Sequence, residues 1–165
     1  MRVNWPNGYP MFYEKIRTYM DELTEGLVVS VDPATGTSSK PGIAIFRGGK
    51  MEWSGELTIK KNGDIFTRMG ELYVKLKEVV PQQPDILLVE EVHKTIAHVH
   101  LLWSVGVTCA ALAPKIMGVE VPLQFWKALA KISPSYVKGD QKDAEMIGAS
   151  VILKAKELQN REHFG

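Results

Sequence analysis

The sequence predicts an α/β domain, in which a mixed five-stranded sheet is flanked by helices. Apolar, β-branched runs alternate along the chain with segments of helical periodicity, in the order β-β-β-α-β-α-β-α. The length of 165 residues suffices for one domain with a real core. Hydrophobic residues make up 45% and charged residues 24%, a balance that is typical of globular proteins and excludes a wholly disordered chain.

Bulk properties restrict the class of protein further. The net charge of +1 neither favours nor excludes a nucleic-acid partner. The single cysteine, Cys109, excludes an internal disulfide framework and a cysteine zinc site, and it fits a reducing compartment. Residues 1–10 lack the apolar stretch of a secretory signal, and the longest apolar run, 101–114, is shorter than the ~20 residues of a membrane span. We therefore expect a cytoplasmic protein.

The N-terminal half is expected to form an extension and then most of the sheet. Residues 1–26 are assigned to an N-terminal extension with one helix over 12–23, and residues 27–165 to the main domain. Within that domain, the expected strands are 27–31, 42–47 and 50–60, with a turn over 32–36 and a hairpin at Gly48-Gly49.

The C-terminal half is expected to alternate helices with two further strands. Asp64 can cap a helix that ends before Pro81. The remaining elements are expected to be a strand over 85–92, a helix over 98–117, a strand over 119–126, a basic connector over 127–139 and a helix over 140–159.

Two of the predicted strands run directly into carboxylates. Val31 is followed by Asp32, and Val89 is followed by Glu90 and Glu91. In open α/β sheets, chemistry gathers at the ends of the central strands. The structural alternative is that Asp32 only opens a turn and that Glu90 faces solvent.

The last predicted helix begins with two more acids. Asp140 and Asp143 are three residues apart and so share one helix face, in the sector that also carries Ile147 and Val151 and therefore points toward the sheet. The alternative is a capping role, because acids favour a helix N-terminus. Together with Asp32 and a strand-end glutamate, these acids would form a set of hard oxygen ligands for Mg²⁺ or Mn²⁺, as in two-metal phosphodiester hydrolysis.

The ordered set of motifs resembles the RuvC-type Holliday junction resolvases. The segment VVSVDPATGTSSKPGIAI resembles their first hairpin and DILLVEEV their fourth strand. The segment HVHLLWSVGVTCAAL is similar to their central helix, and GDQKDAEMI to the start of their last catalytic helix. The resemblance covers about residues 27–160 and implies an RNase H-like fold, with a homodimer that cuts four-way junction DNA by paired nicks using Mg²⁺ or Mn²⁺.

The resemblance also implies site residues. It selects Glu90 over Glu91 and makes the following four residues the catalytic and metal-binding acids: Asp32, Glu90, Asp140 and Asp143. The first 26 residues are extra relative to the bacterial pattern, which fits a phage-encoded or divergent member in a bacterial or phage-infected cell. Recombination and repair of DNA are the processes that such an enzyme would serve.

A basic and aromatic stretch lies beside the expected site. It contains Trp126, Lys127, Lys131, Lys138 and Lys142. Phosphate contacts of this kind position DNA without reading its sequence, and we expect these residues to bind DNA. The alternative is that the lysines are merely solvated.

Other functions remain compatible with the same residues. An RNase H-like nuclease for flaps, RNA–DNA hybrids or precursor RNA would use the same four acids. A non-catalytic DNA-binding module is a further alternative. Residues 32–37 also resemble the phosphate loop of actin-like nucleotide-binding domains, but that fold normally needs two such domains and the chain is too short.

Overall fold

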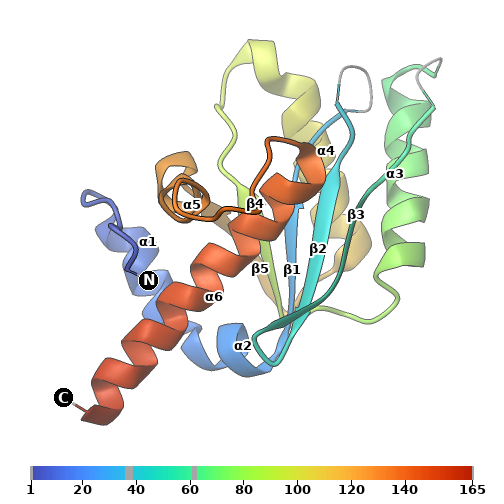
Figure 1. Cartoon of the computed structure of the whole chain (residues 1–165). Coiled ribbons are helices and arrows are strands. Elements are labelled where there is room, and N and C mark those ends of the chain that lie inside the picture. Colours follow the sequence, from blue (N-terminus) through green and yellow to red (C-terminus); the bar gives the residue numbers. More distant parts are fainter. Residues whose placement is uncertain (1, 36–38, 61–62, 165) are drawn as a thin grey trace.

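The computed structural model describes residues 2–35, 39–60 and 63–164, and it contains one mixed sheet with the strand order β3-β2-β1-β4-β5 (Figure 1). The first three strands pair antiparallel, whereas β1 with β4 and β4 with β5 pair parallel. The strands are β1 (Leu27–Asp32), β2 (Gly42–Arg47), β3 (Lys50–Glu56), β4 (Ile86–Glu90) and β5 (Ile116–Val121). The predicted mixed five-stranded α/β sheet is therefore confirmed.

Helices cover both faces of this sheet. They are α1 (Pro10–Thr18), α2 (Met20–Glu25), α3 (Ile65–Val79), α4 (Val99–Leu112, after a 3₁₀ turn over Ile96–His98), α5 (Leu123–Ala130) and α6 (Asp140–Phe164). The long helix α6 crosses one face together with α1, α2 and α5, while α3 and α4 lie on the other face (Figure 1).

Two hydrophobic clusters explain why the central strands read as unbroken apolar runs. Successive side chains of β1 alternate between the clusters, so that Val28 packs under α6 and Val29 packs under α3 and α4. Leu88 and Leu87 of β4 divide in the same way. All four side chains are completely buried, because both sides of the sheet are covered.

The N-terminal segment packs into the larger of these clusters. Phe12, Ile16 and Leu23 are buried with residues of α5 and α6. The single helix expected over 12–23 is instead two helices, α1 and α2, which meet at Tyr19. The segment is therefore joined to α6 through apolar contacts.

Several predicted local features are confirmed. Asp64 caps α3 by accepting a hydrogen bond from the Thr67 backbone N–H at 2.8 Å. Gly48 and Gly49 turn the β2–β3 hairpin with φ angles of +59° and +78°, which favour glycine. The predicted turn over 32–36 and the phosphate-loop reading of 32–37 extend into residues 36–38, which lie outside the described part of the chain.

The region from 98 to 139 differs most from the sequence-based expectation. The helix ends at Leu112 rather than 117, because Ala113 adopts a left-handed φ of +42°. The strand predicted over 119–126 ends at Val121, and residues 123–130 form helix α5 rather than strand and connector. Pro122 immediately precedes that helix in an extended conformation, with a ψ of 139°. Similarly, β3 ends at Glu56 rather than 60.

Within the described part of the chain, no helix combines the length and the apolarity needed to cross a membrane.

Candidate active site

Asp32 and Glu90 lie side by side at the carboxyl ends of the two central parallel strands. Val31 of β1 is paired with Val89 of β4, so the two acids occupy the next positions on neighbouring strands. Their carboxyl groups share a hydrogen bond. Only 9% of Asp32 is exposed, and Glu90 is half-buried. The parallel pairing of β1 with β4 therefore brings two acids that are 58 positions apart in the sequence into contact.

The surroundings of this pair are unfavourable for its negatively charged forms. Burial is the largest cause that raises the pKa of Asp32, to about 9, and the hydrogen bond to Glu90 and the charges of Glu90, Asp143 and Asp140 add to it. Burial and the Asp143 charge also raise the pKa of Glu90, although the hydrogen bond from Asp32 and the Lys127 charge oppose them. Within the pair, Asp32 is therefore the carboxyl that keeps its proton more readily, and its O–H donates a hydrogen bond to Glu90.

Glu91 takes no part in this pair. Its side chain is exposed, and its backbone N–H donates to the carbonyl of Val121 at 3.0 Å. Successive residues of a strand point to opposite faces, so only one of the two glutamates can face Asp32.

Helix α6 starts close to the same sheet edge because β1 and β2 hold its first turn. The Ser30 hydroxyl donates to the Ala144 carbonyl at 2.6 Å. A Cβ at Gly42 would lie 1.9 Å from the Asp140 carbonyl oxygen, so only glycine allows this approach of helix and strand. The Asp140 carboxylate accepts the backbone N–H of Lys40 at 3.1 Å.

Asp143 is the acid of α6 that interacts with both strand-end carboxyls. Its charge raises the pKa of both Asp32 and Glu90, whereas Asp140 acts on Asp32. The Tyr136 hydroxyl donates to Asp143 Oδ1 at 2.5 Å. Burial and this bond to Asp143 raise the pKa of Tyr136 and keep the phenol protonated. Asp143 therefore contacts the connector through Tyr136 and also acts on the two strand-end acids.

The donor set fits a hard divalent cation. Carboxylates from three elements repel one another, and Lys127 is the cation that lowers the pKa of Glu90. Mg²⁺ and Mn²⁺ take such oxygen ligands, which Asp32, Glu90, Asp143 and Asp140 would supply. A bound divalent ion would act as a Lewis acid toward a phosphodiester. Within the described ranges, however, no three His, Cys, Asp or Glu side chains are already arranged to hold an ion.

A pocket of about 460 Å³ adjoins the acids. Glu90 and Asp143 lie at its edge, α5 and the connector form its walls, and its lysines are Lys127, Lys131 and Lys138. All three lysines are exposed. The structure therefore brings three of the four predicted DNA-binding lysines to the pocket beside the acids.

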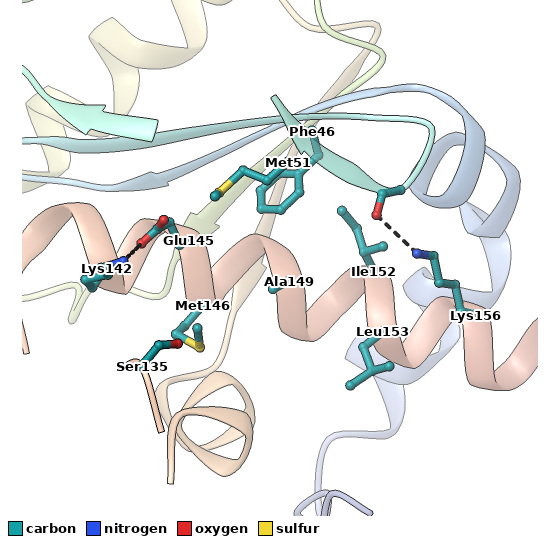
Figure 2. A pocket seen from close by; sticks show the side chains of 11 residues that line it. Phe46, Met51, Ser135, Lys142, Glu145, Met146, Ala149, Ile152, Leu153 and Lys156 are labelled. Atoms are coloured by element: carbon teal, nitrogen blue, oxygen red, sulfur yellow. Dashed lines mark hydrogen bonds and ion pairs between the residues drawn. The ribbon is translucent and has the colours of Figure 1, made fainter. Parts of the chain in front are cut away.

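The other two predicted DNA-binding residues are placed differently from these three lysines. Lys142 pairs with Glu145 at 3.2 Å and lines a separate groove between α6 and the β2–β3 hairpin (Figure 2). Trp126 is only 2% exposed and packs against Tyr136, with ring centroids 6.3 Å apart. Its ring forms part of the core and the pocket wall, and it offers no open face on which a base could stack.

Two side chains near the site make contacts that the sequence did not predict. Tyr136 reaches Asp143 only because the connector folds back over α6. Arg68 of α3 is 7% exposed and donates to the Thr35 carbonyl at 3.3 Å, so it supports the segment that follows β1. Neither partner could be inferred from spacing, since each lies on a different element.

Comparisons with known proteins agree with this fold. No protein-family profile matches the chain, and no curated protein matches it. The structure of Thermus thermophilus RuvC in complex with a Holliday junction substrate superposes with a TM-score of 0.62 and 14% identity, over 80% of this chain and 95% of that chain. A second T. thermophilus RuvC structure has a TM-score of 0.60 and 13% identity, over 81% and 96%. The chain therefore has the RNase H-like fold that RuvC shares.

Proposed function

We propose that this protein is a metal-dependent, structure-selective DNA endonuclease that resolves four-way junctions by paired phosphodiester hydrolysis. The observation that carries the proposal is the contact of Asp32 with Glu90 at neighbouring strand ends, with Asp143 of α6 acting on both. Support for the substrate comes from the fold shared with RuvC, a protein whose structure holds a Holliday junction.

The four acids and the lysines would divide the work by their chemistry. Asp32, Glu90, Asp140 and Asp143 supply oxygen ligands for Mg²⁺ or Mn²⁺. Lys127, Lys131 and Lys138 border the adjoining pocket and supply positive charge to the phosphates on either side of the cleaved bond. Lys142, which is turned toward Glu145, is a more distant phosphate contact.

Paired cleavage also requires two centres, so the proposal includes a symmetric homodimer. A two-fold dimer supplies two equivalent sites for a nearly two-fold substrate. The candidate interface is an exposed apolar groove between α3 and α4, which includes Phe66, Trp103 and Val107. Phe66 and Trp103 are 76% and 43% exposed, and such patches mark interaction surfaces.

The first test compares strand-end variants on defined substrates. We expect Asp32→Asn and Glu90→Gln each to reduce Mg²⁺- or Mn²⁺-dependent cleavage of a four-way junction by about 100-fold or more, since even outer-shell changes at metal sites cost about 10- to 100-fold. Glu91→Gln is the matched control and should cleave like the wild type. Four-way junction, flap, RNA–DNA hybrid and linear duplex are assayed in parallel.

Stability measurements separate lost chemistry from lost folding. Asn at position 32 keeps the hydrogen bond to Glu90 but removes the buried ionisable group, so the metal-free variant should be at least as thermostable as the wild type. Wild-type cleavage by Asp32→Asn would contradict the proposed site. Cleavage of flaps or hybrids in preference to the junction would instead identify a different nuclease of the same fold, and binding without any cleavage a non-catalytic DNA-binding module.

A further inference from the structure

A second pocket of about 450 Å³ lies at the opposite end of α6 from the acids. The N-terminal segment forms one wall of this pocket, and the last turns of α6 form the other. Its charged lining comprises four cations and one carboxylate: Arg2, Arg17, Lys154, Arg161 and Glu157. This excess of positive charge is unusual in a chain whose overall net charge is +1.

Aromatic packing holds the walls of this pocket in place. Trp5 stacks on Phe125 of α5 with ring centroids 4.6 Å apart, and its Nε1 donates to Glu157 Oε2 at 2.8 Å. The Lys154 ammonium lies over the rings of Trp5 and Tyr13, at 5.8 and 5.5 Å from their centroids. The pocket is therefore formed by the extension and α6 together.

The cations of the pocket are incompletely neutralised. Burial lowers the pKa of Lys154, and the nearby charges of Arg161 and Arg17 lower it further against the opposing effect of Glu157. Glu157 already accepts from Trp5 and lies 4.0 Å from Lys154. Arg17 has only an exposed pair with Glu14 at 3.4 Å, and among the described residues no ion pair joins Arg2 or Arg161 to a carboxylate.

We propose that this pocket binds backbone phosphates of a DNA duplex arm that extends from the catalytic site. This inference rests on the proposed function, and it assigns the N-terminal extension a role as a second, distal DNA contact. Phosphates match clustered arginines in charge and in hydrogen-bonding geometry, and they set the position of a duplex without reading its sequence.

The length of α6 determines how far this contact lies from the acids. Arg161 and Asp143 are on the same helix, about five turns or ~27 Å apart along its axis. That distance corresponds to about eight base pairs of duplex, at ~3.4 Å per base pair. Helices α1 and α5 lie on the same side of α6 in Figure 1, and the Trp5–Phe125 contact joins the extension to the helix that carries Lys127 and is followed by Lys131. Basic groups therefore border this side of α6 at both its ends.

The test varies the arm length of the DNA as well as the protein. The full chain with Arg17→Glu and Arg161→Glu is titrated without metal against four-way junctions with arms of about 6 or about 16 base pairs, closed by non-nucleotide linkers. We expect the double variant to bind the long-armed junction about 10-fold more weakly and to lower the salt slope of log K by about 2, since each neutralised phosphate contributes about 0.9. Binding of the short-armed junction should change less than about 2-fold, because a short arm does not reach the pocket.

Lys50→Glu with Lys77→Glu is the matched control, because it makes the same charge change at exposed lysines outside the pocket. Equal effects of the two double variants, or equal loss on long and short arms, would overturn the inference. Unchanged long-arm binding, with inorganic phosphate raising the melting temperature of the wild type but not of the Arg17/Arg161 variant, would identify a free-phosphate site and contradict the DNA assignment. A wild type that binds neither junction would refute the proposed function itself, and the inference with it.

Discussion

At the scale of single residues, Asp32 shows that an acid of the candidate site can be unfavourable for the stability of the fold. A carboxyl at the end of a covered strand is shielded from water, and three other acids act on it, so it keeps a proton far above its ordinary pKa. A structural aspartate would instead be paired with a cation or with backbone N–H groups. The arrangement makes physical sense if positive charge from outside the chain compensates the acids.

Asp85 shows the opposite, stabilising case and provides the second prediction. It accepts the Leu27 N–H at 2.7 Å and pairs with Lys115 at 3.1 Å, and the Leu27 bond is the main reason why its pKa is lowered. A lowered pKa contributes stability above the ordinary value near 4, and this stability is lost as pH falls through the lower folded value. We expect Asp85→Asn to reduce the free energy of unfolding by about 1 kcal/mol at pH 7.

Chemical denaturation at several pH values checks this prediction. The difference between wild type and variant should shrink from pH 7 toward pH 3 and vanish below the folded pKa. A difference that does not depend on pH would show that the charge of Asp85 contributes nothing to its contact with the start of β1.

At the scale of elements, α6 is the part that links core and site. Its buried face carries Ile147 and Val151 against the sheet, while its first turn carries Asp140 and Asp143. The close approach depends on Gly148, where an added Cβ would lie 2.2 Å from the Phe46 ring and 2.7 Å from the Ser30 hydroxyl. Packing of the helix on the sheet therefore determines where the acids lie.

Gly148→Ala gives the third prediction. In an open helix position, replacing glycine with alanine stabilises a protein by about 0.5 to 1 kcal/mol. Gly70 in α3 is such a position, because it is exposed and an added Cβ would have no neighbour within 4 Å. We expect Gly70→Ala to raise the melting temperature and Gly148→Ala to lower it, with a free-energy loss of about 1 to 3 kcal/mol from overpacking.

Cleavage by the Gly148→Ala variant should also fall, since the Asp143 end of α6 would move away from β1. Thermal melts of the two variants, run beside junction cleavage assays, check both statements. Stabilisation by both substitutions would show that Phe46 and Ser30 yield to the added methyl group.

At the scale of the whole molecule, the two faces of the sheet have different exposed surfaces. The α6 face presents basic pockets, whereas α3 and α4 on the other face present the apolar groove around Phe66 and Trp103. Large exposed aromatics of this kind are typical anchors of protein interfaces. The separation leaves the α6 face, with its proposed DNA contacts, free if two copies meet through α3 and α4.

The fourth prediction concerns this assembly. We expect the wild type to have a solution mass of about twice the 18.4 kDa of one chain. Trp103→Glu should shift the mass to that of a monomer, because the interface would bury an unpaired charge, and should uncouple the paired nicks. Met11→Glu, at a 78% exposed residue of α1, should leave the dimer intact. A monomeric wild type that still makes paired nicks on a junction would contradict the dimer.

The sequence alone was sufficient to predict the succession of the five strands along the chain, the cap at Asp64 and the places of Asp32 and Glu90 at strand ends. These features depend on neighbouring residues: a β-branched run, a turn former or a capping side chain acts on backbone within a few positions. The choice of Glu90 over Glu91 as the site acid came from family resemblance and stays a prediction. In the structure, the parallel pairing of β1 with β4 places Glu90 beside Asp32.

Other features were decided by partners that are distant in the chain. Residues 123–126 are apolar enough for either a strand or a helix, and they form α5 because Phe125 and Trp126 pack between α6 and the N-terminal segment. The same packing buries Trp126, and the folded connector brings Tyr136 to Asp143. The pocket at the far end of α6 likewise needs both termini of the chain. Local sequence determines which backbone conformations are favourable, but only tertiary packing determines which side chains lose water and which charges meet.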